Sequence, residues 1–212
     1  FDVAQEKPGV ANGETNNKMT PVEGHGVKIL SIGFFADSNQ AVAWRGPMAS
    51  KALNQMINDV EWGELDYMLI DLPPGTGDIH LSLVQALPLT GAIVVSTPQV
   101  VALADARKGV AMFKMDGIKV PVLGIVENMS YFTPAELPEN KYFIFGEGGA
   151  KLLAEDLKLP CLGQIPIVQS IREAGDIGRP SIMQETTPQA LAFKELTENF
   201  LKHSKIQEFA KA

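Results

Sequence analysis

The sequence predicts an α/β fold, in which a mostly parallel β-sheet carries helices on both faces. Segments of strand length alternate with segments of helical periodicity along most of the 212 residues. The strand-like segments are continuous apolar runs rather than alternating patterns, which is typical of parallel strands buried on both faces. No internal repeat is apparent, so we expect residues 1–212 to form a single domain, with a polar and flexible segment at 1–26.

The individual elements follow from the spacing of apolar residues. Runs of strand length lie at 27–32, 67–71, 91–96, 120–128 and 161–165. Helical spacing lies at 48–60, 79–87, 103–113, 148–157, 170–174 and from 188 to about 203. The last helix has an apolar stripe, and its lysines are balanced by glutamates, so we expect the stripe to face the core rather than a membrane surface. The stripe consists of Phe193, Leu196, Phe200 and Leu201.

Composition excludes several classes of function. The formal net charge of −7 disfavours nucleic acid as a partner, because phosphate contacts need clustered Lys and Arg. No apolar run is long enough to span a bilayer, so no membrane partner is expected, and the polar start does not resemble a signal peptide. The single cysteine, Cys161, excludes an internal disulfide framework and indicates a reducing, cytoplasmic environment. A buried, inert thiol is its expected state.

The stretch around Asp71 indicates a nucleotide site. The apolar run 68–70 ends at this carboxylate and is followed by the rigid loop 72–78, LPPGTGD. An aspartate at the carboxyl end of a parallel strand lies where α/β sheets bind ligands, and it is costly there unless it holds a cation or accepts hydrogen bonds. We interpret Asp71 as a Walker-B-like carboxylate that holds the water shell of a Mg²⁺–nucleotide. The alternative is a solvated aspartate at a strand end.

Other candidate residues allow two interpretations each. The glycines at 146–149, GEGG, precede a helix like a phosphate cradle, but a flexible helix start is the stronger interpretation because Glu147 would repel phosphate. The Asn128 amide is able to pair with a purine edge or to cap the turn after its strand. Arg45 is able to reach a nucleotide or a second subunit, or to pack on Trp44. The histidines have no metal-ligand spacing; they are His25, His80 and His203.

Eight stretches are together more specific than any one of them. They read WRGPM at 44–48, WGELDY at 62–67, IDLPPGTGD at 70–78, TPQ at 97–99, ADARKG at 104–109, VENMSY at 126–131, FGEGG at 145–149 and IREAG at 171–175. In this order they closely resemble the Mrp/ApbC/Nbp35 family of P-loop ATPases, the iron–sulfur cluster carriers, which is related to the MinD and ParA ATPases. The resemblance runs from about residue 26 to the closing helix and implies a P-loop NTPase-like sheet of the MinD/ParA type.

The resemblance implies a function and a set of site residues. Asp71 would be the Walker B carboxylate, acting through Mg²⁺ and its water, and Asn128 with Pro166 and Ile167 would line the adenine site. Members of the family bind and slowly hydrolyse ATP, work as homodimers and pass an iron–sulfur cluster to apoproteins. The resemblance therefore implies ATP and Mg²⁺ as cofactors, and a second copy of the chain and apoprotein acceptors as partners.

The chain departs from the family in two places. It has no G-x-x-x-x-G-K-[ST], and the family's P-loop strand would lie upstream of residue 1. We therefore expect a piece of a longer protein that does not hydrolyse ATP by itself and whose loop 72–78 is poorly constrained. The family's C-x-x-C is also absent, since the loop 131–140 reads YFTPAELPEN. Iron–sulfur iron prefers thiolate, so the sequence argues against cluster binding in the family's usual way. A MinD/ParA-like positioning ATPase and a non-catalytic dimeric scaffold are the alternative functions.

Overall fold

Two compact units divide the chain, residues 1–88 (unit 1) and residues 89–212 (unit 2). The structure is a computed structural model, and it describes residues 18–35, 46–134, 136–137, 139–203 and 206. A single domain over 1–212 stays a prediction. The segment 1–26 that the sequence favours as flexible is described only from residue 18 onward.

Unit 1 begins with a short hairpin. Strands β1 (Val22–Gly24) and β2 (Val27–Ile29) pair antiparallel. Between them, His25 and Gly26 have φ angles of 51° and 77°, and two left-handed residues make the tight turn that suits the twist of a two-residue hairpin. The strand predicted over 27–32 therefore ends at residue 29, where its partner ends. A 3-10 helix, η2 (Ile32–Phe34), follows.

Two helices follow in unit 1, and both are predicted by the sequence. Helix α1 (Gly46–Asn58) contacts helix α2 (Asp78–Ala86), and the hydroxyls of Ser50 and Ser82 lie 2.9 Å apart between them. Leu83 on α2 is fully buried.

The prediction of a strand at 67–71 is wrong, because the structure has no strand there. Residues 66–71 are irregular, and the apolar Leu69 is 83% exposed. A strand is stable only when a neighbouring strand bonds its backbone N–H and C=O groups. Within the described part of unit 1, no strand pairs with these residues. An extended conformation would therefore give the apolar run no backbone hydrogen bonds.

Unit 2 contains the parallel sheet that the sequence predicts. Strands β3 (Ala92–Ser96), β4 (Val122–Glu127) and β5 (Cys161–Gln164) pair in the order β3-β4-β5, all parallel. All six residues of β4 are buried, as expected of a central strand. Gly124 in β4 is required by close packing, because a Cβ there would lie 2.6 Å from Leu162 Cγ on β5 and 2.8 Å from a backbone oxygen.

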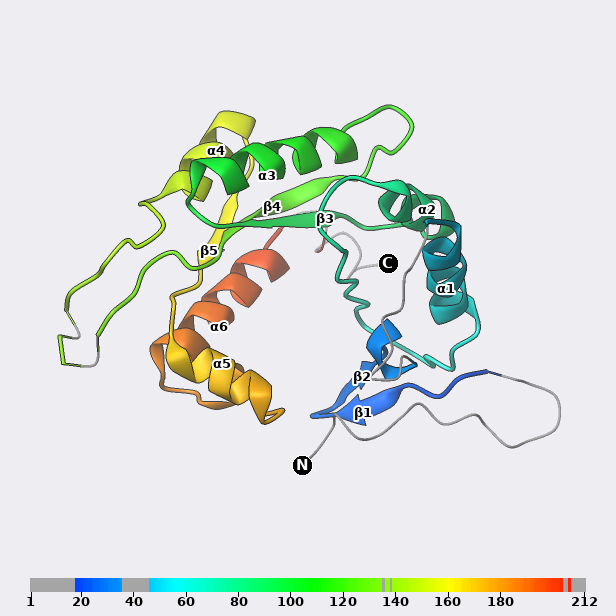
Figure 1. Cartoon of the computed structure of the whole chain (residues 1–212), viewed down its shortest axis with the longest axis horizontal. Coiled ribbons are helices and arrows are strands. Elements are labelled where there is room, and N and C mark those ends of the chain that lie inside the picture. Colours follow the sequence, from blue (N-terminus) through cyan, green and yellow to red (C-terminus); the bar gives the residue numbers. More distant parts are fainter. Residues whose placement is uncertain (1–17, 36–45, 135, 138, 204–205, 207–212) are drawn as a thin grey trace. The chain divides into compact units, whose positions relative to one another are not determined.

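Helices cover both faces of this sheet, as the sequence predicts (Figure 1). The helices α3 (Val100–Phe113) and α4 (Gly149–Leu157) pack on one face, and α6 (Pro188–Leu201) packs on the other. Thr187 caps α6 and a proline begins it, which is a common helix start. The shorter helices α5 (Gln169–Asp176) and η3 (Ser181–Met183) connect β5 to α6.

The core between β4, β5 and α6 confirms part of the predicted stripe on the closing helix. Phe193 and Leu196 pack against a buried cluster, whereas Leu201 is exposed. The buried members of the cluster are Val126, Leu162, Ile165 and Ala192.

Candidate functional site

The carboxyl ends of β3, β4 and β5 lie side by side in unit 2, together with the segments 97–99, 128–132 and 165–167 that follow them. We call this region the carboxyl edge. Backbone hydrogen bonds join its three segments directly. Asn128 N–H donates to Ser96 O at 2.7 Å, and Ser130 N–H donates to Ile165 O at 2.9 Å. Ile167 N–H donates to Tyr131 O at 2.7 Å. Ligands of open α/β sheets bind at such an edge.

The carboxyl edge brings together three of the four site residues that the sequence analysis names. Asn128 follows β4, and Pro166 and Ile167 follow β5, so the parallel pairing of the two strands places them at one end of the sheet. Pro166 is buried and Ile167 is half-buried, which gives the edge an apolar wall. A purine base packs its faces on apolar surface and pairs along its edge with a carboxamide, and residues of both kinds follow these two strands.

The Asn128 side chain caps its own turn, as one of its two interpretations predicts. Its Oδ1 accepts from Met129 N–H at 2.9 Å. Met129 has φ of 54°, a left-handed conformation that costs a non-glycine residue about 1 kcal/mol. The cap does not use the amide Nδ2, for which no partner occurs among the described residues. The carboxamide is thus oriented by its oxygen and retains two donors, so capping and pairing with a base are compatible.

Thr97, after β3, adds a second unused polar group at the carboxyl edge. Its Oγ1 is buried and has no hydrogen-bond partner in the described part of the chain. A buried hydroxyl without a partner is costly, and such an atom beside a candidate ligand site is consistent with a ligand that completes its hydrogen bonding. The residues of this edge therefore fit the base half of a nucleotide.

A buried carboxylate, Glu127, lies at the centre of the edge, and the sequence analysis does not single it out. Glu127 Oε1 accepts from Ser130 Oγ at 2.5 Å and from Gln164 Nε2 at 2.8 Å, and Oε2 accepts from Ala150 N–H at 2.8 Å. Glu127 and Ser130 are fully buried. An acid at the end of the apolar run VLGIVE, with a serine three residues on, is the signal that could have found it.

The glycines at 146–149 serve packing rather than phosphate binding. A Cβ on Gly149 would lie 2.4 Å from Pro98 O, so only glycine allows this approach of α4 to the turn after β3. The N-terminus of α4 already holds an anion, because Ala150 N–H donates to Glu127. The structure thus favours the helix-start interpretation over the phosphate cradle, with close packing in place of flexibility.

Asp71 is exposed and lies in unit 1, on the irregular segment that replaces the predicted strand. The carboxyl edge belongs to unit 2. Its magnesium role stays a prediction.

Two further candidate residues, Arg45 and Trp44, lie outside the described residues. His80, on α2, is buried, and its Nδ1 has no partner among the described residues.

Cys161 lies at the amino end of β5, opposite the carboxyl edge. It is half-buried and lines a cavity of about 350 Å³ with Pro160, Leu162, Asn199, Lys202 and His203. Burial raises the pKa of the Cys161 thiol, while a backbone hydrogen bond from Gly163 opposes the shift. The thiol is therefore protonated near neutral pH, which makes it a poor metal ligand.

The described residues contain no group of three or more His, Cys, Asp or Glu side chains placed to hold a metal ion.

The loop after the carboxyl edge is closed at its base, where Phe132 and Tyr142 exchange two backbone hydrogen bonds of 2.8 Å. In the part of the chain that the structure describes, no helix is both long and apolar enough to cross a membrane.

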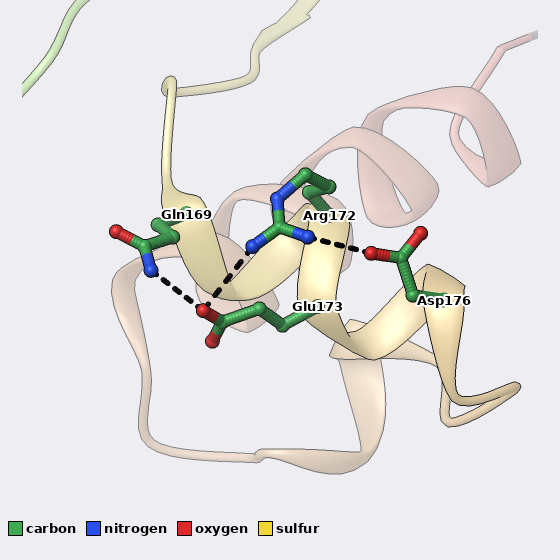
Figure 2. Close-up of polar contacts among 4 residues, drawn as sticks. All are labelled: Gln169, Arg172, Glu173 and Asp176. Atoms are coloured by element: carbon green, nitrogen blue, oxygen red, sulfur yellow. Dashed lines mark hydrogen bonds and ion pairs between the residues drawn. The ribbon is translucent and has the colours of Figure 1, made fainter.

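Helix α5, which follows Ile167, carries a polar network on its exposed side (Figure 2). Arg172 Nη1 lies 2.6 Å from Asp176 Oδ2, and its Nη2 lies 3.4 Å from Glu173 Oε1. Gln169 Nε2 donates to the same Glu173 oxygen at 2.6 Å. Exposed pairs of this kind stabilise a helix by about 0.3–0.5 kcal/mol each, so the network supports α5 rather than forming a site.

This chain is similar in sequence to known proteins. The sequence model of the NUBPL iron-transfer P-loop NTPases matches residues 2–201. An iron–sulfur cluster carrier protein of Synechocystis is 45% identical over 188 residues, which are 89% of this chain and 52% of that protein. The iron–sulfur cluster transfer protein NUBPL of Dictyostelium discoideum is 44% identical over 191 residues, 90% of this chain and 58% of that protein. The chain thus spans between half and three-fifths of the length of these relatives.

Solved structures show the same fold. A nucleotide-binding protein from Archaeoglobus fulgidus, solved in complex with ADP, is 34% identical with a TM-score of 0.68, covering 88% of this chain and 69% of that one. The septum site-determining protein MinD of Pyrococcus horikoshii, solved with Mg-ADP, is 22% identical with a TM-score of 0.52, covering 77% and 62%. At that identity the second likeness shows the fold alone.

Proposed function

The chain belongs to the NUBPL iron-transfer P-loop NTPase family, and from this premise we propose that its intact protein is an ATP-binding iron–sulfur cluster carrier or assembly factor. The observation that carries the proposal is the family match over residues 2–201. The carboxyl edge supports the nucleotide part, because it joins an oriented carboxamide, an apolar wall and an unpaired buried hydroxyl. The ADP complex of the 34% identical relative supports it as well.

We propose the following division of work among the residues. The Asn128 amide donates to the base, and Pro166 with Ile167 lines one side of it. Asp71 holds the water shell of Mg²⁺, which when bound supplies charge neutralisation to the phosphates. The 212 residues contain no phosphate-binding P-loop, so this chain by itself neither hydrolyses ATP nor binds Mg-ATP tightly.

The nucleotide part is tested by calorimetry on the full-length protein and on residues 1–212. We expect Mg-ATP to bind the full-length protein, and Asn128→Ala to weaken that binding roughly tenfold, the loss of about one hydrogen bond. Tight Mg-ATP binding to residues 1–212 would contradict the division of work proposed above.

The cluster part is tested by anaerobic reconstitution of the full-length protein with iron and sulfide, followed by transfer to an apoprotein. A stable, transferable cluster supports the carrier. A second candidate function, a dimeric scaffold without a cluster, is favoured by one observation: the loop 131–140 has no cysteine, and Cys161 is held as a protonated thiol. The scaffold is supported if no cluster forms where a cysteine-bearing relative takes one.

The partners and the compartment are part of the proposal. We propose a homodimer that serves apoprotein acceptors. The cytoplasmic location indicated by the single cysteine stays a prediction, and one relative, from Arabidopsis thaliana, is named as a mitochondrial protein required for NADH dehydrogenase.

A further inference from the structure

Glu127 is the most connected buried group of the carboxyl edge. Its two oxygens receive three hydrogen bonds, from three different segments of unit 2. Ser130 belongs to the turn after β4, Gln164 ends β5, and Ala150 begins α4. All three groups donate, which matches a carboxylate, an acceptor at both oxygens.

The turn that carries Asn128 is closed by this carboxylate. Asn128 and Met129 lie between Glu127 and Ser130, and the 2.5 Å bond from Ser130 Oγ to Glu127 Oε1 joins the two ends of the turn. A left-handed methionine inside the turn persists only where the surroundings hold it. Backbone hydrogen bonds from Asn128 N–H to Ser96 O and from Ser130 N–H to Ile165 O also hold this turn, and the bond to Glu127 adds a fully buried side-chain contact.

The apolar wall of the edge is tied to the same carboxylate. Gln164 Nε2 donates to Glu127 Oε1 at 2.8 Å and to Ser130 Oγ at 3.0 Å, two residues before Pro166. The Glu127 side chain therefore bonds both to Ser130, which ends the turn that carries Asn128, and to Gln164, which directly precedes the segment 165–167.

We propose that Glu127 is a positioning residue for nucleobase recognition: it fixes the Asn128 carboxamide against the wall at 166–167 and does not itself touch the nucleotide. This inference rests on the proposed nucleotide function and adds the residue that preorganises it. A glutamine in its place cannot accept at both ends, because its NH₂ group would face a donor on one side. The turn or the start of α4 must then shift.

The test compares a ligand with a base and a ligand without one. The full-length protein and its Glu127→Gln variant are titrated with Mg-ATP and with Mg-tripolyphosphate. We expect the variant to lose roughly tenfold in affinity for Mg-ATP, the effect of about one misplaced hydrogen bond, and less than about twofold for Mg-tripolyphosphate. Glu155→Gln, an exposed acid on α4, is the matched control and should change neither affinity.

A second variant covers the case that Glu127→Gln does not fold. Gln164→Met removes an exposed side chain that donates to Glu127 and leaves the carboxylate in place. We expect it to weaken Mg-ATP selectively, by roughly threefold. An equal loss for both ligands in the variants that fold, or unchanged Mg-ATP binding, would overturn the positioning role. If the unmodified protein binds neither ligand, the nucleotide function fails first and the positioning role fails with it.

Discussion

Two apolar runs of this chain have opposite fates. The run 122–127 forms the central strand β4 in unit 2, with every residue buried between β3 and β5. The run 67–71 in unit 1 is equally apolar at its centre, yet it is irregular and leaves Leu69 83% exposed. The two runs differ in their neighbouring strands rather than in their composition. A strand is stable only when neighbouring strands bond its backbone, and burial of its side chains stabilises it only then.

The largest expected effect contrasts one leucine from each region. Leu162→Ala removes a side chain that is 1% exposed between β4, β5 and α6, and we expect it to destabilise residues 1–212 by about 3 kcal/mol, through lost burial and a cavity. The matched substitution Leu69→Ala should change stability by less than about 0.5 kcal/mol. Urea unfolding followed by circular dichroism measures both. A similar cost at both sites would show that residues 67–71 are buried after all.

The next effect contrasts two glycines at helix starts. Gly149→Ala in unit 2 forces a Cβ against Pro98 O, and we expect it to cost about 2 kcal/mol through overpacking. Gly77→Ala, at the N-cap of α2 in unit 1, meets no atom within 4 Å and should cost less than about 1 kcal/mol. Thermal melts of the two variants measure the difference. Equal costs would mean that α4 can move away from Pro98 freely.

The smallest effect concerns the two units of the unmodified chain. Both tryptophans lie in residues 1–88, so their fluorescence reports on unit 1, whereas circular dichroism also follows the helices of unit 2. Because unit 1 has the smaller core, we expect its fluorescence midpoint in urea about 0.5 M below the dichroism midpoint. Coincident midpoints would indicate that the two units unfold as one.

Much of unit 2 could be predicted from the sequence, because its periodicity and its neighbours agree. Strands β3, β4 and β5 and helices α3, α4 and α6 lie within three residues of their expected bounds. The pairing of β4 with β5 then places Asn128 and the segment 166–167 at the same end of the sheet. The strand at 67–71 could not be predicted correctly, since sequence periodicity does not reveal whether a partner strand is present.

The Glu127 network was missed for a different physical reason. Its meaning depends on Ala150 and Gln164, which lie 23 and 37 residues away and meet it only when β4, α4 and β5 assemble. A residue-by-residue search for ligand motifs finds exposed donors and acceptors, whereas a carboxylate that is satisfied internally leaves no such pattern. The glycines at 148–149 suggest a phosphate at the start of α4, whereas the group that accepts a hydrogen bond from this helix start is the Glu127 side chain at the end of β4.

The position of Cys161 has a practical consequence for experiments on this protein. It is the only thiol of the 212 residues, and it lies at the end of β5 opposite the carboxyl edge, about 10 Å away along the strand. A maleimide fluorophore would label a single site of residues 1–212, but only slowly at neutral pH, because the raised pKa leaves little of the reactive thiolate. Such a dye would report on α6 and β5 as a spectator, without occupying the region where a base is proposed to bind.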